Sequence, residues 1–150
     1  MGRSVTFTIP GLAKGKGRPR FSTAGGFART FTDKETATWE NFVRLSYINS
    51  GGEKLNGCLT VLILSYFPIP KSVSKKKHAA LVGAPFPHKP DGDNLAKSIL
   101  DALQDIAFDN DMQVTCLTVA KFYSDTARTV VTITELKGDI NENISAGMED

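Results

Sequence analysis

Four aspartates of this 150-residue chain form two short groups whose carboxylates could hold a cation. Asp91 and Asp93 flank a glycine, and Asp109 and Asp111 flank Asn110. In an extended segment, side chains two residues apart point the same way, so Asp91 and Asp93 would present their carboxylates together. Oxygen ligands completed by water suit Mg²⁺ or Mn²⁺, and the two groups therefore predict an open metal site.

The spacing excludes an EF-hand calcium loop, which needs glycine at its sixth position and glutamate at its twelfth. In a loop starting at Asp91, those positions hold Ala96 and Ala102. In a loop starting at Asp109, the sixth position holds Val114. What remains is a site built from two or three carboxylates and water.

Part of this pattern also has a purely structural explanation. Aspartate is a common helix N-cap and Asp-Gly is a common turn, so Asp93 alone would fit a helix start. That explanation accounts for neither Asp91 nor the second acidic group. Lys97 follows Asp93 by one helical turn and could reach what the metal holds, although this spacing is also typical of a surface salt bridge.

These motifs resemble the RusA-type Holliday junction endonucleases of phages, prophages and bacteria. The similarity lies in PDGDNLAKSILDAL (90–103) followed by FDNDMQV (108–114), in the IPG…KGRPRFS segment (9–22), in TFTDKETATWENFV (30–43) and in Lys121. It spans roughly residues 5–136 and touches separated parts of the chain, which makes chance similarity improbable. The resemblance implies a small α+β homodimer that resolves four-way DNA junctions by paired, Mg²⁺-dependent cuts.

Carried over position by position, the resemblance also implies roles for single residues. It assigns metal binding to the three acids of the motifs and catalysis to the same acids and a lysine: Asp91, Asp93, Asp111 and Lys97. Asn94 matches a further residue of the first motif. Where the family usually has two adjacent acids, this chain has Asn110 before Asp111, so neither Asn110 nor Asp109 receives a role.

The net charge is only +2, but the charges are unevenly distributed. Residues 1–20 hold five bases and no acid, residues 71–89 hold five lysines and no acid, and six acids lie between positions 91 and 111. Carboxylates set between basic segments suggest a cation site beside a polyanion, although a mixed, solvated surface is the commoner explanation for charge runs. The predicted nucleic-acid contacts are Lys14, Lys16, Arg18, Arg20, Lys75, Lys76, Lys89 and Lys121.

The elements that must position these residues follow from hydrophobic periodicity and turn residues. Strands are predicted at 5–9, 27–31, 59–67, 114–123 and 128–136, and residues 11–26 are predicted to form a loop. Helices are predicted from Asp33 to the Gly51-Gly52 pair, at 72–81, and from Asp93 or Asn94 to about Ile106, with Asp105 on the solvated face of the last helix. The last two strands are predicted to pair directly as an antiparallel hairpin. This order predicts an α+β fold, a mixed sheet with helices on one face.

Length and composition predict one domain. Residues 1–137 are expected to form a RusA-like endonuclease domain, and 138–150 an acidic, flexible tail. No apolar stretch is long enough for a membrane span, so we expect no membrane association and a cytoplasmic protein. Cys58 and Cys116 lie in apolar runs and are predicted to be reduced core residues.

The predicted function is a metal-dependent, structure-specific endonuclease that resolves Holliday junctions as a homodimer, with Mg²⁺ (or Mn²⁺) and no small-molecule cofactor. Two alternatives stay open from the sequence. One is a branched-DNA-binding protein without catalysis, suggested by the altered Asn110. The other is a metal nuclease that acts on flaps or RNA.

Overall fold

A computed structural model describes residues 2–17, 20–22, 29–31 and 34–136 of the chain. Within them lie a four-stranded sheet in the order β1-β6-β4-β5 and a separate two-stranded pair, β2-β3. Along the chain the elements are β1 (Ser4–Pro10), β2 (Arg20–Ser22), β3 (Arg29–Phe31), α1 (Lys34–Asn49), β4 (Leu59–Pro68), α2 (Lys75–Leu81), α3 (Gly92–Leu103), the 3-10 turn η2 (Asp111–Gln113), β5 (Val114–Ser124) and β6 (Arg128–Glu135).

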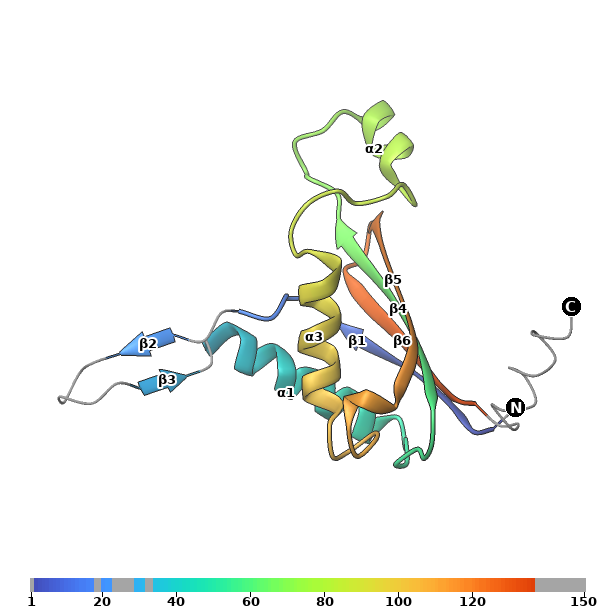
Figure 1. Cartoon of the computed structure of the whole chain (residues 1–150). Coiled ribbons are helices and arrows are strands. Elements are labelled where there is room, and N and C mark those ends of the chain that lie inside the picture. The colour runs from blue at the N-terminus through green and yellow to red at the C-terminus, as the bar shows by residue number, and fades with distance from the viewer. Residues whose placement is uncertain (1, 18–19, 23–28, 32–33, 137–150) are drawn as a thin grey trace, which may run out of the picture.

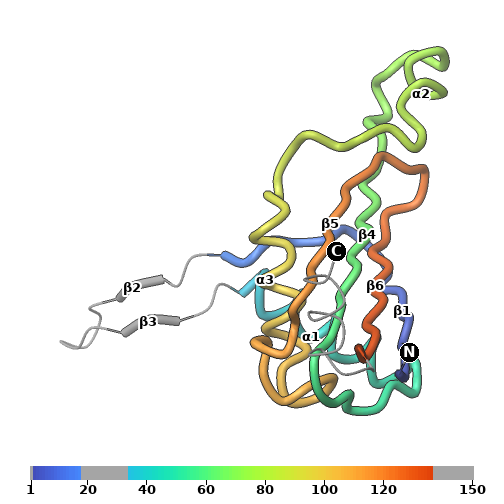
Figure 2. The backbone as a smooth tube through the Cα atoms, turned by 45° about the vertical axis from the view of Figure 1, so that its right-hand side comes forward, coloured from blue at the N-terminus to red at the C-terminus, as the bar shows by residue number. Residues whose placement is uncertain are grey.

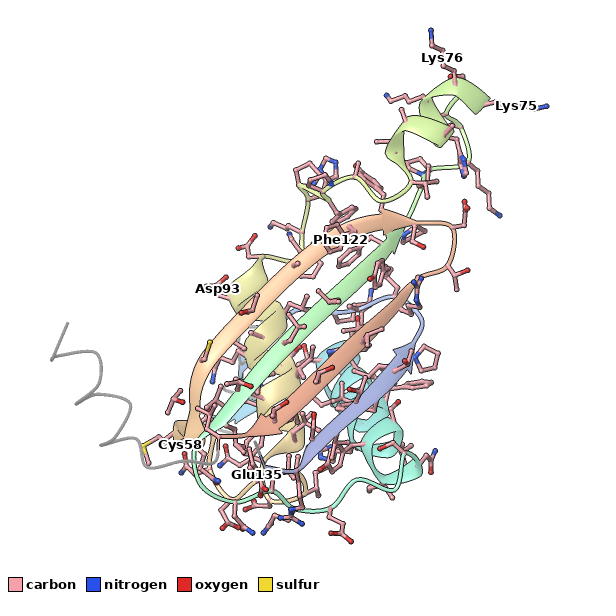
Figure 3. The ribbon with its side chains drawn as sticks, turned by 90° about the vertical axis from the view of Figure 1, so that its right-hand side faces the viewer. Cys58, Lys75, Lys76, Asp93, Phe122 and Glu135 are labelled. Atoms are coloured by element: carbon pink, nitrogen blue, oxygen red, sulfur yellow. The ribbon has the colours of Figure 1, made fainter. Side chains whose placement is uncertain are left out.

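The sheet is mixed, as predicted, and β4, one of its two inner strands, is the most apolar segment of the sequence. β4 runs parallel to β5 and antiparallel to β6, which runs antiparallel to β1. Alternate residues of β4, from Leu59 to Phe67, are buried, and α1 and α3 cover that face of the sheet (Figures 1 and 3). The predicted α+β architecture with helices on one face is confirmed.

The prediction that the last two strands pair directly was wrong. β5 and β6 lie on opposite sides of β4, as Figure 2 shows. The residues between Ser124 and Arg128 therefore cross the end of β4, a distance of about 10 Å or two strand spacings. Alternation within a strand reports which face is buried, but it does not report which strand lies alongside.

Helix α3 carries the predicted apolar stripe, with Leu95, Ile99 and Leu103 fully buried. The indole nitrogen of Trp39 on α1 donates a hydrogen bond to Ser98 Oγ at 3.0 Å, which links the two helices inside the core. The helix ends at Leu103, so the predicted extension to Ile106 was wrong. Asp105 lies in the following turn with φ of 73°, and not on a helix face.

Two further predictions need correction. Residues 11–26 are not all loop, because β2 pairs with β3 in antiparallel register. The cysteines are free, as predicted, but Cys58 is half-buried and Cys116 is exposed on the edge strand β5. Because side chains of a strand alternate between its two faces, only every second residue can enter the core. Cys116 lies on the face of the sheet that the helices do not cover.

The lysine-rich stretch after β4 forms the short helix α2, capped by Ser74, whose hydroxyl accepts from Lys77 N at 3.2 Å. The helix has no buried residue and extends beyond the end of the sheet (Figure 1). None of the helices in the described ranges is long and apolar enough to cross a membrane.

Candidate metal and DNA site at the start of helix α3

Asp91 and not Asp93 occupies the N-cap position of α3, and the helix begins at Gly92, one or two residues earlier than the sequence predicted. Asp91 is extended, with φ −61° and ψ 147°, and its carbonyl accepts the first helical hydrogen bond from Leu95 N at 2.9 Å. Its carboxylate makes no capping hydrogen bond. Asp93 lies in the first turn of the helix and is also exposed.

Both carboxylates lie at the positive end of the helix. No described residue makes a hydrogen bond or an ion pair with the side chain of Asp91 or of Asp93. The exposed N–H groups of a helix start favour negative charge, but two neighbouring carboxylates still repel each other. A cation bound between them would relieve that repulsion. Figure 3 shows Asp93 at this end of α3.

The ammonium of Lys121 fixes the segment that leads into Asp91. Lys121 Nζ donates to the carbonyl oxygens of His88 at 2.7 Å and Pro90 at 2.8 Å. The same ammonium lies 5.7 Å from the ring centroid of Phe86. Lys121 therefore has a structural task in this chain, and its predicted contact with nucleic acid stays a prediction.

Lys97 lies one turn further along α3 and pairs with an acid other than the predicted metal ligands. Its Nζ is 3.4 Å from Asp101 Oδ2, and its side chain is 61% exposed. An ion pair this exposed contributes at most about 1 kcal/mol, so it restrains Lys97 only weakly. The Lys97 ammonium can therefore leave Asp101 at little cost in free energy.

Lys16 links the segment 11–17, here called the basic loop, to both α1 and α3. Its Nζ is 2.6 Å from Glu40 Oε1 on α1 and 3.2 Å from Asp101 Oδ2 on α3. Burial by itself lowers the pKa of the Lys16 ammonium, but the hydrogen bonds to Glu40 and Asp101 outweigh it, and the pKa lies above its usual value. Lys16 thus holds the loop in place, and whether it also contacts DNA stays a prediction.

In the second acidic group, Asn110 and Asp109 make structural contacts, whereas the carboxylate of Asp111 has no partner among the described residues. Asn110 caps η2, accepting from Met112 N at 2.8 Å, and Asp109 is 2.6 Å from Lys54 Nζ. Asn110 therefore has a capping role that explains an amide at this position. No described residue pairs with the side chain of Asp111.

Within one chain, Asp111 lies far from Asp91 and Asp93. The turn η2, which begins with Asp111, leads into β5, whereas Lys121, which contacts the segment before Asp91, lies near the opposite end of that strand. Lys121 follows Val114 by seven residues, a distance of about 23 Å along the strand. Accordingly, no group of three or more histidine, cysteine or acidic residues that could hold a metal is found among the described residues.

The remaining predicted DNA contacts differ in their location and exposure. Lys89 is exposed, and Lys14 is half-buried, with its ammonium 4.0 Å from Glu35. Lys75 and Lys76 extend from the exposed helix α2 (Figure 3). Arg18 lies outside the described residues, and only the backbone of Arg20 is described, in β2.

Sequence reasoning missed three residues that shape this region. Glu40 and Asp101 hold Lys16, and Phe86 lies between two prolines and stacks on Phe67 with ring centroids 4.1 Å apart. Glu40 offered a signal, because it is an acid inside the apolar stripe that contains Trp39 and Val43. Neither Asp101 nor Phe86 stands out by spacing or composition.

The chain is similar to known proteins. The family model "Endodeoxyribonuclease RusA" matches residues 10–134, which include every acid described above. The uncharacterized protein YqaN of Bacillus subtilis (strain 168) is 35% identical over 137 residues, covering 88% of this chain and 96% of its own. The chain therefore belongs to the RusA endodeoxyribonuclease family.

Proposed function

We propose that this protein is a Mg²⁺-dependent endonuclease that resolves Holliday junctions by paired, symmetric cuts during DNA recombination and repair in the cytoplasm. The observation that carries the proposal is a pair of exposed carboxylates, Asp91 and Asp93, at the start of α3 within the family-matched region, neither of which has a partner among the described residues. Mn²⁺ would substitute, and no small-molecule cofactor takes part.

The donor set fits such an ion. Asp91 and Asp93 offer exposed carboxylate oxygens, the ligands that Mg²⁺ and Mn²⁺ prefer. When bound, the ion would acidify a water and neutralise charge on the phosphate. Lys97 would leave Asp101 and place its ammonium against the phosphate, steadying the charge that develops as the bond breaks.

We further propose that the protein works as a homodimer paired along β5. β5 is an edge strand, and its residues from Thr115 to Thr118 are exposed. Its far end is already covered, because Phe86 N donates to Lys121 O and Tyr123 N donates to Ala84 O. The unpaired backbone N–H and C=O groups of an edge strand can form hydrogen bonds with a second strand. Two copies related by a two-fold axis would pair antiparallel there.

This dimer would complete the metal site. An antiparallel pair centred near Leu117 sets Val114 of the partner subunit opposite Ala120. Asp111 of the partner subunit, three residues earlier, then approaches Lys121, whose ammonium contacts Pro90 beside Asp91. Each site would take two carboxylates from one copy and the third from the other, and two such sites suit the two symmetric cuts of a four-way junction.

The decisive experiment compares substrates. Purified protein is incubated with four-way, flap and linear DNA and with a branched RNA, each with and without Mg²⁺. Paired cuts confined to the four-way DNA and dependent on metal support the proposal. Binding of the junction without any cutting favours a branched-DNA-binding protein, and cutting of flaps or RNA in preference favours the other nuclease.

A further inference from the structure

A cavity opens beside Asp91 that the proposed chemistry does not use. It has a volume of about 480 Å³ and lies between the basic loop and the segment that leads into α3. Its lining is mostly apolar and includes Leu12, Phe67, Phe86 and Pro90, together with the lysines Lys14, Lys16 and Lys89. Asp91 is the one acid among its lining residues.

The cavity is held open by contacts of the surrounding backbone. Lys16 N donates to Asn94 O at 2.9 Å, and Ser98 Oγ donates to Lys14 O at 2.9 Å, so the loop is fixed to α3. A Cβ at Gly15 would approach Pro90 Cβ to 2.9 Å, which shows how closely loop and helix start meet. This cavity therefore does not need to form on binding.

The lining selects for a flat aromatic group attached to an anion. Phe86 stacks on Phe67 with planes 9° apart, giving the cavity an aromatic wall. Lys89, which is exposed and has no acidic partner among the described residues, would attract negative charge, and Asp91 marks where the cut phosphate would lie. The side-chain amide of Asn94 also lines the cavity and has no hydrogen-bond partner among the described residues, so it can pair with the edge of a base.

We propose that this cavity receives one unstacked nucleobase of the strand to be cut, and that Asn94 reads its edge. The inference rests on the proposed function, because it assumes that a DNA phosphate lies at Asp91. When a four-way junction opens, the base pairs that flank its centre lose one stacking partner, so removing a base from its stack costs less there than in a continuous duplex. The cavity would then select which junction sequences are cut.

The first test combines junctions that lack a single base with a protein variant whose cavity is filled by a larger side chain. Four-way junctions carry a single abasic nucleotide at each position around the cut, and single-turnover cleavage is measured. We expect one position at which the missing base slows cleavage by roughly 5- to 150-fold, the range for a lost base–aromatic contact. Leu12, 47% exposed at the cavity, is changed to Trp to fill it, with exposed Leu45→Trp on α1 as the matched control.

Leu12→Trp should slow cutting of the intact junction but add little to the loss caused by the abasic position, whereas Leu45→Trp should change neither. Two results would overturn the proposal of a base-binding cavity and leave the nuclease proposal intact. In the first, the effects of Leu12→Trp and of the abasic position on the cleavage rate multiply, as independent effects do. In the second, the protein cuts junctions but no abasic position slows it.

A second measurement needs no cleavage. NMR spectra of the protein are recorded with each of the four deoxynucleoside monophosphates and with deoxyribose 5-phosphate. The nucleotides should shift the amide signals of Gly15, Phe86 and Asn94, and the sugar phosphate should not. Equal shifts with both probes, or no shift at these residues, would refute base binding even if the protein proved not to cut junctions.

Discussion

The side-chain ammonium of Lys121 lies 2.8 Å from the carbonyl oxygen of Pro90, the residue directly before Asp91. A strand of the sheet thereby sets the position of a predicted metal ligand through the backbone. The lysine was predicted to contact DNA, and the two roles have different experimental signatures.

Replacing Lys121 with Met separates them. Loss of both carbonyl contacts should let the segment before Asp91 shift, and a displacement of about 1 Å at a reacting group can slow a reaction on the order of 100-fold. Cleavage should fall by about that factor while junction affinity in calcium changes little. If affinity falls instead, and the slope of log affinity against log salt drops by about one, Lys121 is a phosphate contact. Lys89→Met is the control for a lost surface charge.

Asp93→Asn tests the proposed metal site with little change of shape. Asp93 is exposed and makes no described contact, so the free energy of unfolding should change by less than about 0.5 kcal/mol. Cleavage should fall by several orders of magnitude because the metal loses a ligand. Junction binding without metal should hold or tighten, since a carboxylate facing a polyanion is removed.

The matched control is Asp105→Asn. Asp105 adopts a left-handed backbone, which asparagine tolerates well, so folding and cleavage should both be retained. Single-turnover cleavage of a synthetic four-way junction, measured beside binding in calcium, gives both quantities. Near-parental cutting by Asp93→Asn would remove the main support for the nuclease.

A shared site predicts complementation between two inactive variants. Asp93→Asn and Asp111→Asn homodimers should each be inactive. In a mixed dimer one site loses both carboxylates, while the other keeps Asp91 and Asp93 from one copy and Asp111 from the partner. Mixing the two proteins should therefore restore cutting at one strand per dimer, seen as nicked rather than resolved junctions. No activity after confirmed subunit exchange would show that each site lies within one chain.

The Arg3–Glu135 pair predicts a specific acid sensitivity. Hydrogen bonds from the Arg3 side chain, then from the backbone N–H groups of Asn56 and Arg3, lower the pKa of Glu135 from 4.5 to about 2. Because the pKa is lower in the folded state, the resulting stability is complete above about pH 4.5 and is lost as the pH falls toward 2. Urea unfolding at pH 7 and pH 3 measures it.

Glu135→Gln should lower stability at pH 7 and flatten this pH dependence. Glu53→Gln, at the exposed carboxylate that also contacts Arg3, should leave the dependence in place. An unchanged pH profile in Glu135→Gln would assign the acid sensitivity to other groups.

The sequence could predict much of the fold because its strongest patterns are local. The stripe of Leu95, Ile99 and Leu103 defines a helix, and the apolar run from Leu59 to Phe67 defines an inner strand. Neighbour relations are not local, so the insertion of β4 between β5 and β6 could not be read from alternation. Spacing patterns report faces and turns, whereas sheet order depends on the packing of the whole chain.

The same limit applies to the site. Asp91, Asp93 and Lys97 were predicted correctly to share one helix start, because they lie within two turns of sequence. The distance to Asp111 depends on the length and direction of β5, and the pairing of Lys16 with Glu40 and Asp101 depends on how two helices pack. Opposite charges far apart in a sequence carry no signal of their contact.

Helix α2 contributes no side chain to the core, although it lies in the sequence between β4 and α3, the helix that Asp91 caps. Its charge can therefore be redesigned while the thermal stability of the protein stays nearly constant. Variants from fully basic to neutral α2 would form a graded series that tests whether Lys75 and Lys76 contact DNA, as predicted. If they do, junction affinity should fall along the series while the cleavage rate of the bound junction stays constant.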